Sequence, residues 1–367
     1  MTIPSSSKFM EIRTTPHAGR SYHSTVDLPE NSCLMDISTP YAYTIYKQFR
    51  NEVCSECFRY DGGRRSFLTC REYSESAGLS FCNDQCRDQW LIREGADAVR
   101  LLARVESARQ KGKQKVKGDA LPRTSGTAED IEREWEKVRR LEKSAKDVRK
   151  WRRIALDDFQ ADAARYVVLA LHHLFQELSS VGHVSDLGGS CWRTFVSLQS
   201  SETIRIKQFP ELLDDHISIY QVLRGLFTSD KDLARQIYDG RQPEPEELLF
   251  SDVITVENVR RILAVDAGNS FGIWERPLID NSELLGFAVY PVPSFFNHDC
   301  SPNVQSSGHG RKLRFLTTRA VTSGEALCIS YGHVESLPMK ERKKVLLEGW
   351  FFDCVCRKCV SESGHAE

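Results

Sequence analysis

The spacing of the cysteines restricts what this chain can fold into more than any other feature of the sequence. The chain contains twelve cysteines, and seven of them form a C-x2-C pair, a C-x3-C pair and a C-x-C-x2-C triplet: Cys54 and Cys57, Cys82 and Cys86, and Cys354, Cys356 and Cys359. Clusters as close as these chelate zinc readily, and they favour metal binding over disulfides. The sequence therefore predicts small zinc-binding modules toward both ends of the chain.

Length and composition exclude several classes of protein. The 367 residues are enough for two or three structural units and a sizeable core. The formal net charge is -1, so no global field draws the chain to nucleic acid or to a membrane surface. The longest apolar stretches, such as 166–174, are too short to cross a bilayer, and the N-terminus has no apolar signal core. We expect a soluble intracellular protein whose first eight residues are disordered.

Periodicity divides the chain into a strand-rich start, a helical middle and a strand-rich end. Short strands are expected over 9–12, 21–26 and 33–37, and again within the turn-rich segment 270–335. Residues 107–128 are rich in Lys, Gly, Ser and Thr and predict a flexible loop. This pattern indicates an α+β fold class.

The helical middle is expected to begin with a helix over 129–155, where apolar residues recur every three or four positions. Further helices are predicted from Asp157 or Asp158 to about residue 177, and over 211–227, 230–237 and 256–267. Basic residues outnumber acidic ones from 110 to 153, which is typical of a solvated amphipathic helix. A contact with nucleic acid or a nucleosome is the alternative interpretation of this basic stretch.

Three strings near the end of the chain carry polar, aromatic and cysteine residues in a fixed order. They read FFNHDCSPN at 295–303, GEALCISY at 324–331 and CVCRKC at 354–359. Together they resemble the catalytic end of a SET-domain protein lysine methyltransferase. The upstream cluster of Cys54, Cys57, Cys82 and Cys86 resembles a MYND-type zinc finger. The chain is thus similar to the SET-and-MYND family, and most closely to its shorter fungal-type members.

The resemblance implies a mainly β SET fold with a pseudoknot, which is split by an insert. It places residues 9–50 and 268–335 in the SET core, 51–90 in the finger, 91–267 in the helical insert and 336–367 in a cysteine-rich segment that closes the site. Larger family members continue past this segment with a long helical domain. We therefore expect a more open substrate groove on that side.

Methyl transfer to lysine requires the sulfonium of S-adenosyl-L-methionine, its methyl group and the lysine amine to lie in line. An exposed lysine has a pKa of about 10.4, and a narrow apolar channel lowers that value. Alignment and electrostatics then supply most of the catalysis. The resemblance makes Tyr331 the active-site tyrosine, with the role of orienting the methyl and the amine. A phenol is a doubtful general base at neutral pH.

The remaining candidate site residues also follow from the resemblance. The cofactor-binding set comprises Tyr331 together with Gly19, Arg20, Asn269, Asn297, His298, Trp350 and Phe352. The lysine channel is expected to include Tyr331, Phe352 and, with weaker support, Tyr290. Asn269 has a simpler interpretation as a helix C-cap. Two positions depart from the family pattern, Ser21 after Gly19-Arg20 and Asp299 after Asn297-His298. They put cofactor affinity in doubt more than the chemistry.

We expect two structural zinc ions. The first would be bound by Cys54, Cys57, Cys82 and Cys86, and the second by Cys300 together with Cys354, Cys356 and Cys359, both in closed tetrahedral sites. A full MYND finger binds two ions, but only Cys70 is spare here and no histidine lies between His23 and His172. The finger therefore resembles a degenerate, structural one. Cys33, Cys70, Cys191 and Cys328 are expected to be buried in apolar surroundings.

The leading hypothesis is an enzyme that methylates lysine in a protein substrate, either histone or non-histone, and that acts as a monomer in nucleus and cytoplasm. A catalytically silent SET and zinc-finger adaptor is the alternative from another class. A zinc-finger nucleic-acid binder is a third interpretation, against which the near-neutral net charge argues. Neither the lysine that is methylated nor the number of methyl groups added follows from the sequence.

Overall fold

A computed structural model describes residues 9–16, 19–69, 75–110, 126–179, 191–228, 248–279 and 281–363. The expectations for residues 1–8, for most of the loop 107–128, for the helix 230–237 and for Cys70 lie outside this part of the chain. The strands are β1 (Met10–Thr15), β2 (Gly19–Ser24), β3 (Cys33–Ile37), β4 (Ala42–Ile45), β5 (Leu68–Thr69), β6 (Ser80–Phe81), β7 (Ser270–Trp274), β8 (Leu284–Val289), β9 (Asn297–His298), β10 (Val304–His309), β11 (Lys312–Thr317) and β12 (Cys328–Ile329). The helices are α1 (Asp84–Glu106), α2 (Ala128–Leu141), α3 (Ala145–Trp151), α4 (Asp158–Ser179), α5 (Trp192–Ser197), α6 (Glu202–Gln208), α7 (Glu211–Phe227), α9 (Val256–Val265), α10 (Met339–Trp350) and α11 (Arg357–Ser363).

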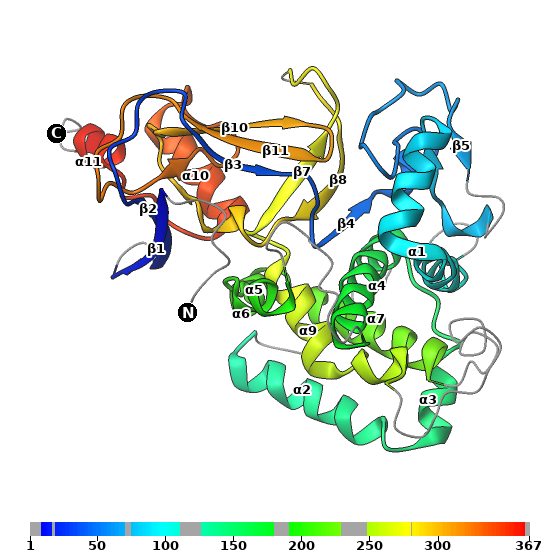
Figure 1. The fold of residues 1–367 in the computed structure, drawn as a ribbon. Coiled ribbons are helices and arrows are strands. Elements are labelled where there is room, and N and C mark those ends of the chain that lie inside the picture. The colour runs from blue at the N-terminus through cyan, green and yellow to red at the C-terminus, as the bar shows by residue number, and fades with distance from the viewer. Residues whose placement is uncertain are drawn as a thin grey trace.

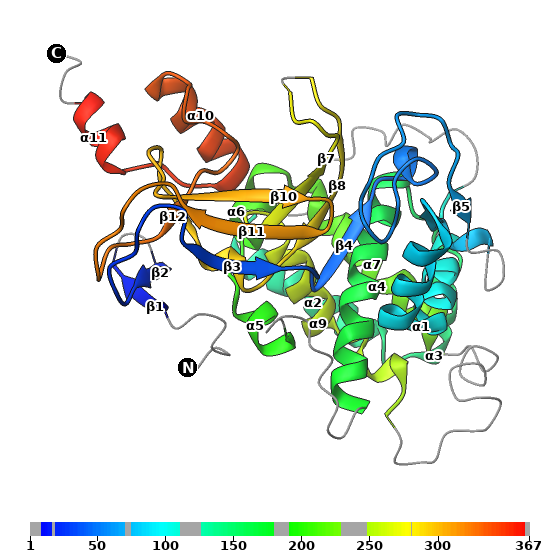
Figure 2. The same cartoon turned by 45° about the horizontal axis from the view of Figure 1, so that its top comes forward.

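The small sheets are built from strands that lie far apart in the sequence. β3 pairs antiparallel with β11, which also pairs with β10, and β4 pairs antiparallel with β8, which also pairs with β7. Both views show these strands on one side of the molecule together with α10 and α11, and α1, α3, α4 and α7 on the other (Figures 1 and 2). The predicted α+β class is confirmed. We propose, on the basis of this pairing, that residues 9–50 and 268–335 form one SET unit.

Helix α4 is the centre of the helical part. Every position from Gln160 to Leu174 except Ala163 is buried, because its apolar residues occupy nearly every face. It packs against α1, β4, α7 and α9 and so joins the helices to the sheets. The expected start is also observed, since the Asp157 carboxylate accepts a hydrogen bond from the backbone N–H of Gln160 at 2.8 Å. None of the described helices is both long and apolar enough to cross a membrane.

The single helix expected over 129–155 is wrong, because two helices occupy this segment. α2 ends at Leu141, and Ser144 begins α3 by accepting a hydrogen bond from the backbone N–H of Asp147 at 3.3 Å. A serine side chain that bonds a backbone N–H in this way favours the start of a new helix over the continuation of the previous one. The break allows the Trp151 side chain to pack against α7, where an added Cβ at Gly225 would lie 3.2 Å from that of Trp151.

The segment around Cys54 and Cys57, called the finger below, is held against the sheets by a buried arginine in the turn between β10 and β11. Arg311 is 4 % exposed and donates to the Ser55 carbonyl at 3.3 Å, to the Glu56 carboxylate at 3.3 Å and to the Glu94 carboxylate at 3.3 Å. Glu94 is fully buried and also accepts from His173 at 2.7 Å. Burial alone would raise the pKa of Glu94, but His173 and the arginines hold it well below its usual range. The finger, helices α1 and α4 and the β10–β11 turn therefore meet at one charged cluster.

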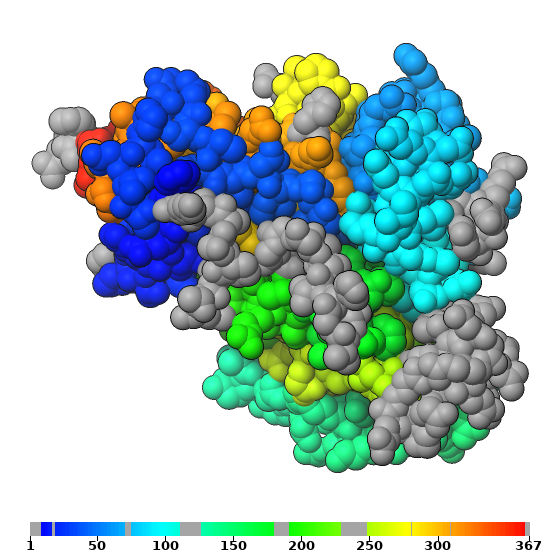
Figure 3. Space-filling model, viewed as in Figure 1, coloured from blue at the N-terminus to red at the C-terminus, as the bar shows by residue number. Residues whose placement is uncertain are grey.

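Gly310 makes the closest approach between the same turn and the finger. Its φ is +63°, and an added Cβ would lie 2.0 Å from the Cys57 carbonyl oxygen. The hairpin between β7 and β8 rises between the N-terminal strands and the finger (Figure 3). Only glycine satisfies both the backbone conformation and the short distance.

Gly310→Ala is expected to lower the free energy of unfolding by about 2–5 kcal/mol, because it adds a backbone collision to the strain of a positive φ. Gly62→Ala is the matched control, since Gly62 has φ +72° with no atom within 4 Å of an added Cβ. It should cost only about 1–2 kcal/mol. Denaturant unfolding of the two variants measures the difference, and equal losses would show that the finger does not press on this turn.

Candidate active site

A pair of short parallel strands brings two of the sequence strings together. In the parallel pairing of β9 with β12, Asn297 lies opposite Cys328 and His298 opposite Ile329. The backbone N–H of Asp299 donates to the Ile329 carbonyl at 3.0 Å and extends this pairing. Tyr331 follows two residues after β12 and therefore lies beside the Asn297-His298 turn, as the order of the strings predicts.

His298 links this turn to Tyr331 on one side and to a cysteine on the other. Its Nδ1 accepts a hydrogen bond from the Tyr331 backbone N–H at 2.9 Å, and its Nε2 lies 3.2 Å from Cys300 Sγ. Because Nδ1 accepts, the proton of the neutral ring is on Nε2 and is donated toward the sulfur. Burial lowers the pKa of His298 to about 4, which keeps the ring neutral.

The Tyr331 ring is enclosed by other rings. The ring centroids of Trp350 and His298 each lie 5.4 Å from that of Tyr331, and Phe352 lies edge-on at 6.3 Å. The Tyr331 hydroxyl donates to the Phe296 carbonyl at 2.8 Å. Burial raises the pKa of this phenol well above its usual value, so it is a hydrogen-bond donor at neutral pH and not a base.

Two backbone features bring Trp350 and Phe352 onto Tyr331. Phe351 ends α10 in the left-handed conformation, with φ +64°, and turns the chain so that both of its neighbours contact the tyrosine. Gly332 has φ +64°, and an added Cβ would lie 2.9 Å from the Trp350 ring. A side chain at residue 332 would therefore push Trp350 away from Tyr331.

The predicted cofactor residues Arg20 and Asn269 both contact the segment just before Asn297. The Arg20 guanidinium lies 5.1 Å from the centroid of the Phe295 ring and also bonds the Ser197 carbonyl. The Asn269 carbonyl accepts from the Ser294 hydroxyl at 3.0 Å. The Asn269 side chain donates to the Val265 carbonyl at 2.8 Å, so it also has the capping geometry of its simpler interpretation.

Gly19 and Tyr290 are not brought onto Tyr331 by any contact among the described residues. Gly19 is exposed in the β1–β2 hairpin with φ +62°, and no atom lies within 4 Å of an added Cβ. Tyr290 is 2 % exposed, and its hydroxyl donates to the Arg311 carbonyl at 2.6 Å, on the side of the finger. Their roles at the cofactor and in the lysine channel stay predictions.

One buried polar group next to Tyr331 in the chain has no partner, and the rings around Tyr331 define the character of the site. The Ser330 hydroxyl, next to Tyr331 in the chain, is buried and has no hydrogen-bond partner among the described residues. Buried hydroxyls usually have a partner, so this one is an exception. The neutral imidazole of His298, the phenol of Tyr331 and the aromatic faces of Trp350 and Phe352 suit a ligand that is both polar and flat.

The second set of four cysteines adjoins this site. The Sγ atoms of Cys300, Cys354, Cys356 and Cys359 all lie within 4.8 Å of one another. Cys300 Sγ is 3.8 Å from that of Cys354 and 3.6 Å from that of Cys359. Four sulfurs about 2.3 Å from a tetrahedral zinc are about 3.8 Å apart, so the donor set fits zinc.

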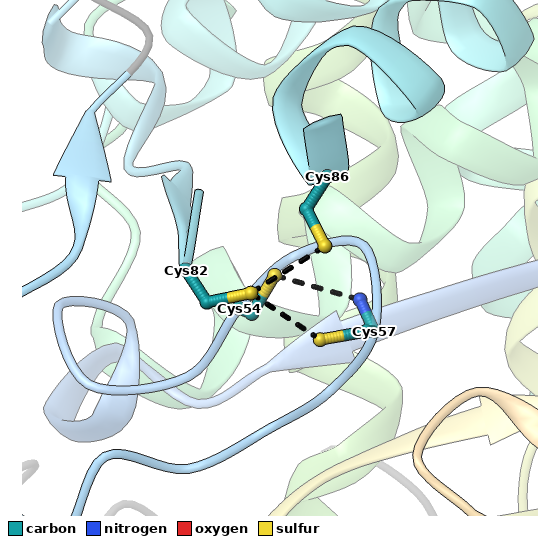
Figure 4. Close-up of side chains that lie close together, drawn as sticks. All are labelled: Cys54, Cys57, Cys82 and Cys86. Carbon is teal, nitrogen blue, oxygen red and sulfur yellow. Dashed lines mark hydrogen bonds between the residues drawn. The ribbon is translucent and has the colours of Figure 1, made fainter. Parts of the chain in front are cut away.

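The finger cysteines form an equivalent cluster at the other end of the molecule. The sulfurs of Cys54, Cys57, Cys82 and Cys86 lie within 4.8 Å of one another, and they come from a loop, from the end of β6 and from the start of α1 (Figure 4). The Cys57–Cys82 and Cys82–Cys86 sulfur distances are 3.7 and 3.4 Å. Within the described residues no third group of this kind is present.

The expectation for the remaining cysteines is partly wrong. Cys33, at the start of β3, is exposed, whereas Cys191 and Cys328 are half-buried. Cys33 stands at the edge of a strand where its neighbours Leu34 and Met35 supply the buried contacts. Cysteine side chains are usually buried, but the register of β3 turns the Cys33 side chain away from the core.

Arg342 is a residue of this site that the sequence did not reveal. It is 2 % exposed in α10, and it lies 3.6 Å from Cys359 Sγ. The surrounding letters Glu341-Arg342-Lys343-Lys344 are typical of a solvated helix face. Its spacing was the one signal in the sequence. Met339, Leu346 and Trp350 are apolar, and together with position 342 they recur every three or four residues, so residue 342 lies on the apolar side of the helix.

Comparison with known proteins defines the class. The family model described as SET domain matches residues 131–332, which is more than half of the chain. The chain therefore belongs to the SET-domain family, and the predicted resemblance is confirmed.

Individual relatives narrow this assignment. The chain is 27% identical to the potential protein lysine methyltransferase SET6 of Saccharomyces cerevisiae, over 97% of this chain and 96% of that protein. It is 36% identical to a SET and MYND domain-containing protein of Dictyostelium discoideum, over 29% of this chain and 26% of the relative. It is 33% identical to the histone-lysine N-methyltransferase ASHR2 of Arabidopsis thaliana, over 29% of each protein. The yeast relative is thus similar over nearly its whole length, whereas the other two have a higher identity over a short region.

Proposed function

We propose that this protein transfers methyl groups from S-adenosyl-L-methionine to the ε-amine of lysine in a protein substrate. The observation that carries the proposal is the pairing of β9 with β12, which puts Tyr331 against His298 and beneath Trp350 and Phe352 in a member of the SET-domain family. The protein-lysine activity in the names of two of the relatives supports the same reaction.

The residues present suit the demands of this chemistry. S-adenosyl-L-methionine, when bound, supplies a methyl group that is already activated by its sulfonium. Trp350 and Phe352 provide apolar walls that exclude water and lower the pKa of a lysine amine between them. The Tyr331 hydroxyl stays protonated and orients the reacting groups, because burial raises its pKa. Asn297, His298 and Asn269, with the Gly19-Arg20 turn, are the residues we assign to the cofactor.

The two cysteine clusters are proposed to hold one structural zinc ion each. Cys300 belongs to the turn that follows Asn297-His298, whereas Cys354, Cys356 and Cys359 follow Trp350 and Phe352. A metal in this cluster would fix the proposed cofactor side of the site to its aromatic wall. The finger cluster, beside the Arg311 contacts, would have a purely structural role.

Binding of S-adenosyl-L-methionine to zinc-loaded protein tests the proposal by calorimetry. We expect measurable heat and an affinity about tenfold weaker in Asn297→Ala, because one hydrogen bond to a charged ligand is lost. Asn258→Ala is the control, since that amide bonds the Val253 carbonyl at 2.9 Å beside α9 and is not part of the site. Absence of heat would favour a catalytically silent adaptor, and unchanged affinity in Asn297→Ala would remove Asn297 from the cofactor set.

We propose a lysine in a histone or another protein as the acceptor, a monomeric enzyme, and action in nucleus and cytoplasm. Labelled methyl transfer into whole-cell extract, followed by mass spectrometry of the marked lysines, identifies the acceptor. The same experiment counts the methyl groups added.

A further inference from the structure

The Arg342 side chain lies beneath the second cysteine cluster and contacts three different parts of the chain. One Nη2–H donates to the Glu362 carboxylate at 2.7 Å, and the same nitrogen lies 3.6 Å from Cys359 Sγ. Nη1 donates to the Leu337 carbonyl at 2.7 Å. Arg342 thus joins α10 to the cluster, to α11 and to the loop that follows Tyr331.

One donor of Arg342 has no protein acceptor. Its Nε is buried and has no hydrogen-bond partner among the described residues, although a buried guanidinium normally uses most of its donors. Besides the Glu362 carboxylate, the cysteine sulfurs are nearby groups that carry negative charge once a metal has removed their protons. The placement of Arg342 is therefore explained by a charged cluster better than by four neutral thiols.

The negative charge of a four-thiolate zinc site favours a positively charged side chain beside it. One divalent ion and four thiolates leave a net charge of -2. Cys300, Cys354 and Cys359 are buried here, whereas in the finger cluster only Cys54 is. An uncompensated charge at a buried site costs several kcal/mol, and water can do less to offset it at the second cluster than at the first.

We infer that Arg342 is the counter-charge of the second cluster and that it couples zinc binding there to the position of the loop after Tyr331. The guanidinium places a positive charge against the cluster, which it shares with the partly exposed Glu362 carboxylate, and at the same time it holds the Leu337 carbonyl. Loss of the metal leaves the guanidinium only its bonds to Glu362 and to the Leu337 carbonyl, which loosens the loop and the Trp350 side of the site. This inference rests on the second zinc site and does not require methyl transfer.

The test compares three variants of the full-length, zinc-loaded protein. Arg342→Met keeps the length of the side chain and removes the charge, whereas Arg342→Lys keeps the charge and loses the fork of donors. The Glu362 side chain is 38 % exposed and forms a salt bridge with Arg342. Glu362→Gln removes this salt bridge and leaves the arginine in place. A variant of merely structural importance would lose both zinc ions together when the chain unfolds.

Two measurements report on the clusters separately. Zinc release to a coloured chelator gives the rates, and pulsed alkylation with peptide mass spectrometry shows which cysteines become reactive. We expect Arg342→Met to release one ion about ten- to a hundredfold faster and to expose Cys354, Cys356 and Cys359, with Cys54 and Cys57 unchanged. Arg342→Lys should show a smaller effect, and Glu362→Gln little.

The opposite results are equally clear. Release rates in Arg342→Met that match the unmodified protein would overturn the inference, as would equal acceleration at both clusters, which reports general destabilisation. A larger effect of Glu362→Gln than of Arg342→Met would also overturn it, since the salt bridge and not the cluster would then be the role of Arg342. Failure of cofactor binding leaves each of these readouts interpretable.

Discussion

Replacing Tyr331 by phenylalanine is expected to reduce methyl transfer about a hundredfold while cofactor affinity stays close to that of the unmodified protein. The hydroxyl is the only part removed, and one preorganised hydrogen-bonding group at a reacting centre contributes on this scale. The ring itself keeps its contacts with Trp350, His298 and Phe352, so the aromatic enclosure should survive. Single-turnover transfer of labelled methyl measures the effect.

A second tyrosine separates catalysis from stability. The Tyr43 hydroxyl donates to the Ser55 carbonyl at 2.9 Å, much as that of Tyr331 donates to Phe296, but it lies beside the finger. Tyr43→Phe removes this bond and also the one that the buried Trp90 indole N–H donates to the Tyr43 hydroxyl at 2.7 Å, so it should lower stability by about 2–3 kcal/mol and leave turnover intact. Turnover in Tyr331→Phe equal to that of the unmodified enzyme would refute the role assigned to this residue.

Cys356→Ser is expected to lower the zinc content from two ions to one and to abolish methyl transfer. The hydroxyl of serine is a poor zinc ligand, and removal of one of four ligands opens a closed structural site. The aromatic residues Trp350 and Phe352 would lose their attachment to Cys300, so the segment from residue 338 onward should become disordered. Plasma mass spectrometry gives the metal content, and hydrogen exchange follows the segment.

An exposed cysteine supplies the control for this substitution. Cys33→Ser makes the same chemical change at a position outside both clusters and should leave two ions and full activity. Cys82→Ser should also lose one ion, but from the finger, with the exchange of residues 338–363 unaltered. A metal content of two ions in Cys356→Ser would remove the second site from the proposal.

The parts of the site that were predictable from sequence are those in which characteristic residue types follow one another in a fixed order along the chain. Asn297-His298, Tyr331 and the cysteine triplet occur in a fixed order, and the structure brings His298, Tyr331, Trp350 and Phe352 together. The bounds of α7 and the start of α4 also follow from apolar periodicity and a capping aspartate. Such features depend on local sequence alone.

Features that depend on distant contacts were not predictable. Ser144 divides a segment whose periodicity is continuous, and the reason is the packing of Trp151 on α7. Arg342 is buried among charged letters because sulfurs 17 residues away along the chain fold over it. The approach of Gly310 to Cys57 joins positions separated by most of the chain. In each case the cause is a neighbour that a single sequence does not identify.

The pairing of β3 with β11 and of β4 with β8 has a consequence for synthesis of the protein. The first strands leave the ribosome more than 200 residues before their partners, so for most of translation they have nothing to pair with. The apolar helix α4 emerges in the same interval. The nascent chain therefore exposes unpaired strands and apolar helix surface for many seconds. We expect its yield in cells to depend on chaperones that bind such surface.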